Sequence, residues 1–396
     1  MPQQASRMQL VRPSAIRELL ALAADPDVIS FGGGYPDPDL FPARELAAAY
    51  ARALGEQAAV SLQYTHSEGL PRLREQLAER MRADGMECGP EHLFLVQGAQ
   101  QAIDLVGKMW LEPGDVVLTE EPTFLGGLVG LNPYEPEYRA VRTDDHGMDP
   151  DHLEEVLRAN PRAKLIYTIP DFHNPTGVTM TTERRRRVVE LAREHDVVIL
   201  EDAPYRELYF GAAPLPTLKS FDTDGRVFHV GSFSKTLAPG LRTAWVVADA
   251  ELIERLALLK LASDTQNSTL NMAAISNYLE EQDYDAHLDR IRDHYRGKRD
   301  HTVAALRAEL SDDIRYVTPQ GGLFLWLEFP EDVDTDRFLR EVLIPEYRVA
   351  FVPGSSFYSE NPRYSRGRLG FPTLPVDRIS QGIRRIAEGY NAFRSV

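Results

Sequence analysis

The stretch "GSFSKTLAPGLR", residues 231–242, follows the apolar run "RVFHV" and contains a single lysine, Lys235. Ser232 and Ser234 precede this lysine, and Arg242 follows it. A lysine amine attacks carbonyl groups once it is removed from water or placed beside another cation. Hydroxyl groups and a guanidinium are suitable donors for a phosphate. A lone lysine in such a loop is usually a surface residue, so the rest of the chain must decide between the two interpretations.

Composition sets broad limits on the kind of protein. The chain has 396 residues, of which 43% are hydrophobic and 26% charged, as in an ordinary globular enzyme of two domains. Its net charge of −16 argues against nucleic acid or an anionic membrane as the main partner. A single cysteine, Cys88, rules out an intramolecular disulfide framework and favours a reducing, cytoplasmic location. We expect no signal peptide and no membrane span.

The middle of the chain alternates β-rich runs with helical patterns. "GDVVLTEEPTF" and "DVVILEDAPYREL" are typical of strands that end in a loop, and "TTERRRRVVELAREH" is typical of an amphipathic helix. This alternation predicts an α/β fold with a mostly parallel central sheet. The pattern changes near residue 285, which indicates a smaller α+β domain. We expect an N-terminal arm, 1–43, that joins the small domain, a large domain over 44–284, and the small domain over 285–396.

Distinctive residues stand just after five of the expected strands. They are Gly98, Ala99 and Gln100, then Phe124, then Asn174, then Asp202 with Tyr205, and finally Ser232, Ser234 and Lys235. In open α/β sheets, ligands bind in the crevice outside the carboxyl ends of the strands. The five segments therefore predict one shared site.

The chemistry of these residues suits one cofactor. Gly98 and Ala99 open an expected helix, whose free N–H groups offer a second cradle for a phosphate. A reactive lysine beside a phosphate site indicates pyridoxal 5′-phosphate held as a Schiff base. Asp202 can keep the ring nitrogen of this cofactor protonated, and Phe124 can stack on its ring. Asn174 and Tyr205 can donate hydrogen bonds to the ring oxygen.

The motifs together resemble one known family. "SAIRELL", "LQYTHSEG", "NPTG", "DAPYRELYFG", "GSFSKTLAPGLR" and "GGLFLWLEFP" run over nearly the whole chain. The chain resembles the fold-type I, class I/II aminotransferases that depend on pyridoxal phosphate, and is most similar to the subgroup of 2-aminoadipate and kynurenine aminotransferases. The resemblance implies an aspartate aminotransferase-like fold, with a large cofactor-binding domain and a smaller α+β domain.

The resemblance also implies roles for single residues. Lys235 is then the Schiff-base lysine, and Asp202 pairs with the ring nitrogen. Arg368, in "GRLGF", binds the α-carboxylate of the substrate, and Gly34 contacts the substrate through its backbone. Tyr64 reaches the cofactor phosphate of a neighbouring subunit, which implies a homodimer with shared active sites.

Several positions depart from the family pattern. Ala99 replaces a common serine, Phe124 a frequent tyrosine, and His173 a frequent glutamine, while Tyr35 and Asp37 stand where small or apolar residues are common. These departures leave the core of lysine, aspartate and arginine unchanged. We expect His173, Tyr35 and Asp37 to be the positions that could alter the substrate pocket.

The substrate is the least determined part of the sequence analysis. Arg17 matches an arginine on a mobile helix that can meet a side-chain carboxylate in the subgroup. That favours acidic substrates, with 2-oxoglutarate as acceptor. Asp37 and Tyr35, expected at the pocket mouth, favour basic or polar donors instead. The helix that carries Arg17 can swing away in the subgroup, so aromatic and aliphatic side chains are also allowed. All three possibilities remain open at this point.

The reaction implied by the resemblance is transfer of an amino group between an L-amino acid and a 2-oxo acid, with ping-pong kinetics and Lys235 as general acid and base. One alternative is another reaction with the same cofactor, such as elimination, decarboxylation or an oxidase-like reaction. A second is a sensor domain without enzymatic activity, although the motifs leave no room for an N-terminal winged helix. His287, His294 and His301 recur about 10 Å apart along a helix, too far for one metal ion, so we expect no metal.

Overall fold

The computed structural model describes residues 5–9, 25 and 27–395. Within these residues the largest sheet has eight strands in the order β2-β9-β8-β7-β6-β3-β4-β5. The strands are β2 (Leu93–Val96), β3 (Val116–Glu121), β4 (Glu137–Asp144), β5 (Gly147–Met148), β6 (Ala163–Thr168), β7 (Val198–Asp202), β8 (Val227–Ser232) and β9 (Ala244–Val247). Five neighbouring strands, from β8 to β4, run parallel, whereas β9 is antiparallel to β8 and to β2. The predicted α/β class with a mostly parallel sheet is confirmed.

Near-continuous apolar runs explain why the parallel strands lie in the middle of the sheet. Strands β7 and β8 are buried along their whole length, as expected where helices cover both faces. The link between β8 and β9 contains only the short 3₁₀ turn Pro239–Leu241, so β9 returns antiparallel without a helical crossover. Because β2 is antiparallel to β9, it runs in the same direction as β8. The carboxyl ends of β2, β3, β6, β7 and β8 therefore share one edge.

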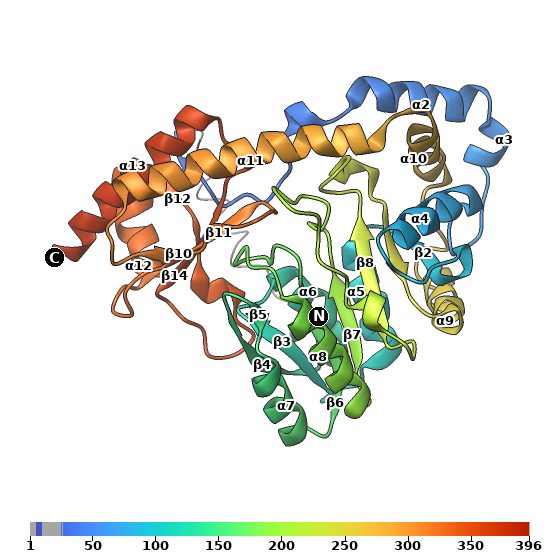
Figure 1. Ribbon diagram of the computed structural model, residues 1–396, viewed down its shortest axis with the longest axis horizontal. Coiled ribbons are helices and arrows are strands. Elements are labelled where there is room, and N and C mark those ends of the chain that lie inside the picture. Colours follow the sequence, from blue (N-terminus) through green and yellow to red (C-terminus); the bar gives the residue numbers. More distant parts are fainter. Residues whose placement is uncertain (1–4, 10–24, 26, 396) are drawn as a thin grey trace.

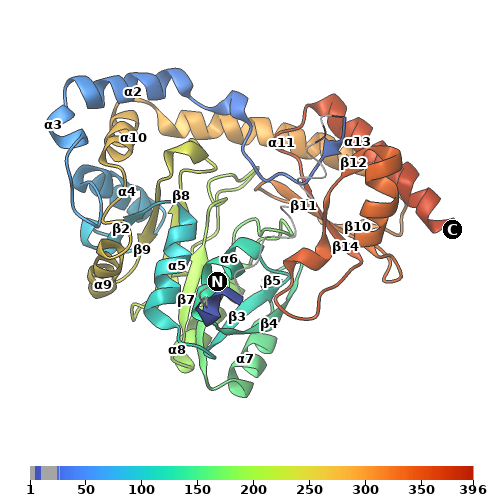
Figure 2. The same ribbon diagram turned by 180° about the vertical axis from the view of Figure 1, so that it is seen from behind.

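Helices cover both faces of this sheet (Figures 1 and 2). On one face α8 packs with α7 around a core that includes Ile199 and Leu191. On the other face α5 packs against Leu200 and Phe228. The N-cap residues Asp149 and Thr181 accept backbone N–H groups of the first turns of α7 and α8. The helices of this part are α2 (Ala43–Gly55), α3 (Ala58–Ser61), α4 (Pro71–Ala83), α5 (Ala99–Trp110), α6 (Leu125–Leu131), α7 (Pro150–Ala159), α8 (Thr182–Glu194), α9 (Ala250–Leu261) and α10 (Thr269–Glu281).

A second group of elements lies beside the large sheet. Its described strands form an antiparallel sheet in the order β10-β11-β14-β13. The elements are β10 (Arg315–Tyr316), β11 (Phe324–Glu328), α12 (Thr335–Arg337), the π-helical η7 (Phe338–Tyr347), β13 (Val352–Pro353), β14 (Arg366–Gly370) and α13 (Val376–Arg394). The long helix α11 (Tyr284–Glu309) runs along the molecule from α10 to α13 and links the two groups (Figure 1).

An N-terminal segment packs on the second group. Strand β1 (Ile29–Ser30) pairs in parallel with β12 (Val349–Ala350). The backbone N–H of Phe31 continues this pairing by donating to Ala350, and Gly370 donates in turn to Phe31. The segment 32–35 that follows is thereby carried to the edge of the large sheet. Among the described helices, none is long and apolar enough to cross a membrane.

Candidate active site

A cavity of about 320 Å³ opens at the carboxyl edge of the large sheet, beside the second sheet. Its lining draws on segments that are far apart in the sequence. The lining residues are Gly32, Gly33, Gly34, Tyr35, Phe124, Leu125, Gly126, Val129, Asn174, Tyr205, Lys235, Phe324 and Arg368. Seven of the residues predicted from the sequence are in this set, namely Gly34, Tyr35, Phe124, Asn174, Tyr205, Lys235 and Arg368.

The Lys235 amine lies inside this cavity rather than on the surface. Its Nζ donates a hydrogen bond to the backbone oxygen of Gly34 at 2.9 Å. Burial and the nearby Arg368 cation lower the pKa of Lys235 to about 8, although Asp202 opposes the shift. A substantial fraction of the amine is therefore neutral near physiological pH, which is the nucleophilic form.

Asp202, the last residue of β7, is 2% exposed. Its Oδ2 accepts a hydrogen bond from the Tyr167 hydroxyl at 2.8 Å, whereas its Oδ1 is buried without a partner. Burial raises the pKa of Asp202 to about 6, against the opposing effects of Tyr167, His229 and Lys235. A buried carboxylate oxygen without a donor requires a hydrogen-bonding or cationic group. Asp202 Oδ1 is thus an acceptor that a protonated ring nitrogen could satisfy.

Arg368, on β14, is a buried cation held by two neutral groups. Its Nη1 donates to Asn174 Oδ1 at 2.8 Å, and its Nη2 donates to the Gly32 backbone oxygen at 2.9 Å. Its Nε is buried without a partner, and burial lowers the pKa of Arg368 to about 10. In the described part of the chain no carboxylate forms an ion pair with it. A guanidinium in this state is ready to bind an anionic ligand.

Aromatic rings form the walls around these polar groups. The Phe324 ring lies 4.2 Å from Arg368 Cζ and meets the Tyr205 ring edge-on at 5.6 Å between centroids. Asn174 Nδ2 donates to the Tyr205 hydroxyl at 3.3 Å. A Cβ on Gly34 would come within 2.5 Å of the Phe324 ring, so only glycine fits beside it. These contacts hold Asn174, Tyr205 and Arg368 in one hydrogen-bonded row.

The residues predicted to hold a phosphate gather at the start of α5. Gly98, with φ of 87°, is the N-cap of α5, and a Cβ there would lie 2.3 Å from Arg242 Nη2. Arg242 Nη2 donates to the Gln97 backbone oxygen, and Ser232 Oγ accepts the Ser234 N–H at 3.1 Å.

The first N–H groups of a helix have no partner within it, so Ala99 and Gln100 can offer theirs to an anion. Gln100 Nε2 also donates to the Gly126 backbone oxygen, beside the cavity. The unpartnered Asp202 oxygen, the start of α5 at Gly98 and the half-buried Lys235 together fit pyridoxal phosphate.

Two predicted residues lie outside this cluster or outside the description. Tyr64 is 80% exposed and does not line the cavity. Arg17 lies outside the described residues. Tyr35 lines the cavity but is 64% exposed, so it forms part of the rim.

The prediction that Asp37 lies at the pocket mouth is wrong. Its carboxylate is buried against Lys298 Nζ at 2.7 Å and His294 Nε2 at 3.0 Å, and it caps a short 3₁₀ turn through Asp39. Burial raises the pKa of Asp37, but these contacts outweigh burial and the net pKa is lowered. The carboxylate is already neutralised by Lys298, so it cannot select basic donors.

His173 also lies away from the cavity. Its ring contacts Thr176 Oγ1 at 2.9 Å and Glu120 Oε2 at 3.2 Å. Of the three histidines on α11, His287 contacts the Thr236 backbone oxygen, His294 contacts Asp37, and His301 contacts Ser380. Among the residues that the structure describes, no group of histidine, cysteine and acidic side chains could hold a metal ion.

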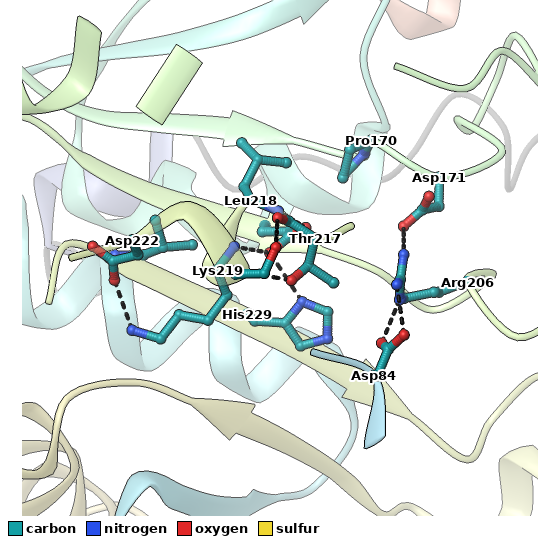
Figure 3. Close-up of polar contacts among 12 residues, drawn as sticks. Asp84, Pro170, Asp171, Arg206, Thr217, Leu218, Lys219, Asp222 and His229 are labelled. Atoms are coloured by element: carbon teal, nitrogen blue, oxygen red, sulfur yellow. Dashed lines mark hydrogen bonds and ion pairs between the residues drawn. The ribbon is translucent and has the colours of Figure 1, made fainter. Parts of the chain in front are cut away.

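Buried ion pairs support the segment that follows Asp202. Arg206 lies between two carboxylates, with contacts of 2.6 Å to Asp84 and 3.0 Å to Asp171 (Figure 3). On the adjacent strand, His229 Nδ1 contacts Glu201 Oε2 at 3.0 Å. Arg206 follows Tyr205 directly, so its ion pairs fix the loop that carries Tyr205.

Several of the residues described above could not be recognised from the sequence. Tyr167 was part of an apolar run that predicts a strand, and its only signal was a hydroxyl in a buried position, which usually needs a partner. Phe324 lies in "GGLFLWLEFP", where the alternation predicts a strand but not which ring faces the site. Arg206 and Asp171 carried no signal, because their pairing joins separate loops.

The chain is similar to known aminotransferases over almost its whole length. A model of the family "aminotransferase class I and II" matches residues 26–386. A 2-aminoadipate transaminase of Thermus thermophilus is 39% identical over 95% of this chain and 93% of its own. An aromatic-amino-acid aminotransferase of Thermococcus litoralis is 38% identical over 96% of this chain and 91% of its own. The crystal structure of a Thermus thermophilus α-aminoadipate aminotransferase, complexed with N-(5′-phosphopyridoxyl)-L-leucine, matches with a TM-score of 0.90 and 37% identity, over 99% of this chain and 98% of that one.

Proposed function

The chain belongs to the class I and II aminotransferases, and on that premise we propose that the cavity around Lys235 is its active site. The protein is an aminotransferase of fold type I that uses pyridoxal 5′-phosphate and moves an amino group between an amino acid and a 2-oxo acid. We propose which residues carry out each part of this reaction.

The residues at the carboxyl edge divide into those for the phosphate and those for the ring. The phosphate would be held by the N–H, hydroxyl and guanidinium donors of Gly98, Ala99, Gln100, Ser232, Ser234 and Arg242. Asp202 would pair with the ring nitrogen through its unpartnered Oδ1. Asn174 and Tyr205 would donate to the ring oxygen, and Phe124 would cover one ring face.

Bound pyridoxal phosphate supplies an electron sink for the negative charge that develops at the substrate Cα. Arg368 binds the α-carboxylate of the substrate and fixes the position of Cα. Asn174 orients Arg368 through the 2.8 Å hydrogen bond. The Lys235 amine, neutral in part because its pKa is lowered to about 8, would take the proton from the substrate Cα as a base and deliver it to C4′ of the cofactor as an acid.

The strongest support for this proposal is the state of Arg368. Arg368 is a buried cation with an unpartnered Nε, and it lines the same cavity as the Lys235 amine. A buried charge without a counter-ion is costly unless a ligand neutralises it. An α-amino acid carries the carboxylate that Arg368 requires, and its α-amino group is the group that the reaction transfers.

The lining of the cavity favours a broad range of donors. Tyr35, Phe124, Leu125, Val129 and Phe324 offer apolar or aromatic surface to a side chain. Aromatic and aliphatic L-amino acids are therefore the proposed donors, in agreement with the name of the Thermococcus litoralis relative and with the leucine derivative bound in the Thermus thermophilus structure. We retain 2-oxoglutarate as the proposed acceptor, with Arg17 as the candidate for its distal carboxylate. Basic donors lose their support, because Asp37 is paired with Lys298.

A half-reaction tests the proposal. The holoenzyme is mixed with one amino acid at a time, and the oxo acid formed and the amine form of the cofactor are measured. Phenylalanine, leucine, 2-aminoadipate, glutamate and lysine make a suitable panel. We expect one oxo acid per active site from the aromatic and aliphatic donors and little from lysine. Loss of carbon dioxide or ammonia in place of oxo acid would show a different reaction with the same cofactor.

The two-domain division and the oligomeric state are also proposals. The β1–β12 pairing supports an N-terminal arm, 1–43, that joins a small domain over 285–396, with the large domain over 44–284. A homodimer with shared sites is supported by the exposed side chains of Leu62 and Tyr64, which are 68% and 80% exposed. We propose a cytoplasmic location, in keeping with the single, buried cysteine.

A further inference from the structure

Tyr167 stands beside Asp202 on the neighbouring strand. In the parallel pairing of β6 and β7, Tyr167 lies opposite Leu200, so Asp202 is its diagonal neighbour on the same face of the sheet. The Tyr167 hydroxyl donates to Asp202 Oδ2 at 2.8 Å, while Oδ1 has no partner. Tyr167 itself is wholly buried.

The Tyr167 ring is also fixed from the opposite side. A Cβ on Gly127, in α6, would lie 2.4 Å from this ring. Glycine inside a helix costs stability relative to alanine, and here it allows α6 to pack directly on the ring. The hydroxyl is therefore held at one place relative to β7 by both the strand and the helix.

We propose that Tyr167 is a positioning residue for Asp202, which holds Oδ2 so that Oδ1 faces the ring nitrogen of the cofactor. This inference rests on the proposed role of Asp202. The hydroxyl satisfies one carboxylate oxygen and leaves the other as the sole free acceptor. It also stabilises the ionised form of a carboxylate that burial disfavours.

The charges around this pair are few. Tyr167 on β6, His229 on β8 and Lys235 face Asp202, and each of them favours its ionised form. Glu120 and Tyr205 face the Tyr167 hydroxyl as well. Burial, followed by the Asp202 charge, raises the pKa of Tyr167, so the phenol stays protonated and remains a donor.

The test uses the holoenzyme of Tyr167→Phe, reconstituted with pyridoxal phosphate that is isotopically labelled at the ring nitrogen. The nitrogen NMR shift, followed against pH, reports when the ring nitrogen loses its proton. We expect this to occur about one to two pH units lower in Tyr167→Phe, because a hydrogen bond to a charged group contributes about that much. The affinity of the apo-protein for the cofactor should fall in parallel.

Tyr390→Phe is the matched control. Tyr390 is 2% exposed and donates to Asp313 at 2.7 Å, but it lies on α13, remote from the cavity. Its loss should lower stability without moving the ring-nitrogen titration. An equal shift in Tyr390→Phe would overturn the inference, because the effect would then be general.

Asp202→Asn distinguishes a failure of the positioning role of Tyr167 from a failure of the proposed role of Asp202. If Asp202→Asn shifts the titration while Tyr167→Phe leaves both titration and affinity unchanged, the positioning role is wrong and the role of Asp202 stands. If Asp202→Asn changes neither the ring-nitrogen titration nor the cofactor affinity, the proposed role of Asp202 is wrong. The positioning role of Tyr167 is then wrong as well. Should Tyr167→Phe not fold, Gly127→Ala displaces the same ring, and an unchanged titration in that variant would equally overturn the inference.

Discussion

Arg368 Nη1 donates to Asn174 Oδ1 at 2.8 Å, and this contact joins the second sheet to the loop that follows β6. The two residues are far apart in the sequence and belong to different groups of elements. Their contact therefore depends on how the small and large parts of the molecule pack together. Arg368 lines the cavity, and its Nε is buried without a partner.

This arrangement predicts a specific defect in Arg368→Gln. The loss of a charge-assisted hydrogen bond should lower kcat/KM about tenfold to hundredfold for all amino-acid donors. Cofactor affinity should stay close to that of the unchanged protein, because no phosphate donor is altered. Steady-state kinetics and cofactor titration provide the measurements.

Arg366→Gln is the control for Arg368→Gln. Arg366 lies on the same strand, β14, but its side chain donates to Ser365 and Glu331 instead of lining the cavity. Its replacement should leave kcat/KM almost unchanged. An equal loss in both variants would mean that β14 itself had been disturbed and that Arg368 has no special role.

The lowered pKa of Lys235 predicts the pH dependence of cofactor capture. Since the neutral amine is the nucleophile, the rate at which the apo-protein captures pyridoxal phosphate should rise with pH, with a midpoint near the pKa of about 8. For stability the sign follows from the lowered pKa of a base. The charged amine destabilises the folded apo-protein below pH about 8, and this penalty disappears as the pH rises toward 10.5.

Stopped-flow absorbance across this pH range measures the capture rate. A midpoint close to the ordinary lysine value of 10.5 would show that burial does not activate the amine. The reactivity of an exposed lysine toward a modifying reagent, measured over the same pH range, gives the reference titration for an ordinary amine.

The structure indicates that Asp37 contributes to the stability of the fold and not to the choice of substrate. Replacing Asp37 by Asn leaves the buried Lys298 cation without its counter-ion, although Lys298 still donates to the Pro372 backbone oxygen. The free energy of unfolding should fall by about 3–5 kcal/mol. The stabilising effect should be present at neutral pH and be lost as the pH falls below the ordinary carboxyl value of 3.8, because the net pKa of Asp37 is lowered.

Chemical denaturation and a donor panel check this prediction. Asp39→Asn is the matched control, because Asp39 is exposed in the same turn and its loss should change stability by about 0.5 kcal/mol or less. A changed ratio of kcat/KM for basic over aliphatic donors in Asp37→Asn would contradict the assignment.

Much of the fold could be predicted from local patterns. Apolar runs that end in Asp202 or Ser232 predicted buried parallel strands, and parallel strands present their carboxyl ends at one edge, so the residues that follow them had to meet. The short link from β8 to β9 made an antiparallel return the only option for that strand.

The parts that could not be predicted depend on contacts between distant segments. Asp37 meets Lys298 and His294 only because the N-terminal segment packs along α11. Tyr167 lies in an apolar run whose periodicity indicates burial but not the carboxylate on the next strand. Phe324 approaches Gly34 through the packing of the second sheet against the N-terminal segment. Local residue spacing carries no signal for such pairings.

The exposed Tyr64 predicts sites shared between two subunits. Sedimentation should show a dimer. When Lys235→Ala and Tyr64→Ala chains are co-expressed, the hybrid dimer should contain one intact site, made of Lys235 from one chain and Tyr64 from the other. We therefore expect the purified hybrid to regain roughly half of the tight cofactor binding of the unchanged dimer, with each parent variant showing none.

Cofactor titration of the purified hybrid shows whether Tyr64 acts across the subunit boundary or within its own chain. If Tyr64 acts within its own chain, the hybrid retains no site in which both residues are intact, and tight binding does not return. A monomer with full activity would contradict the shared-site proposal directly.

Chemical trapping tests whether Lys235 carries the cofactor. Holoenzyme is reduced with borohydride, digested and analysed by mass spectrometry. We expect a single phosphopyridoxyl-modified peptide, the one that contains Lys235, and its absence in Lys235→Ala. Modification of another lysine in the unchanged protein, with Lys235 unmodified, would contradict the account.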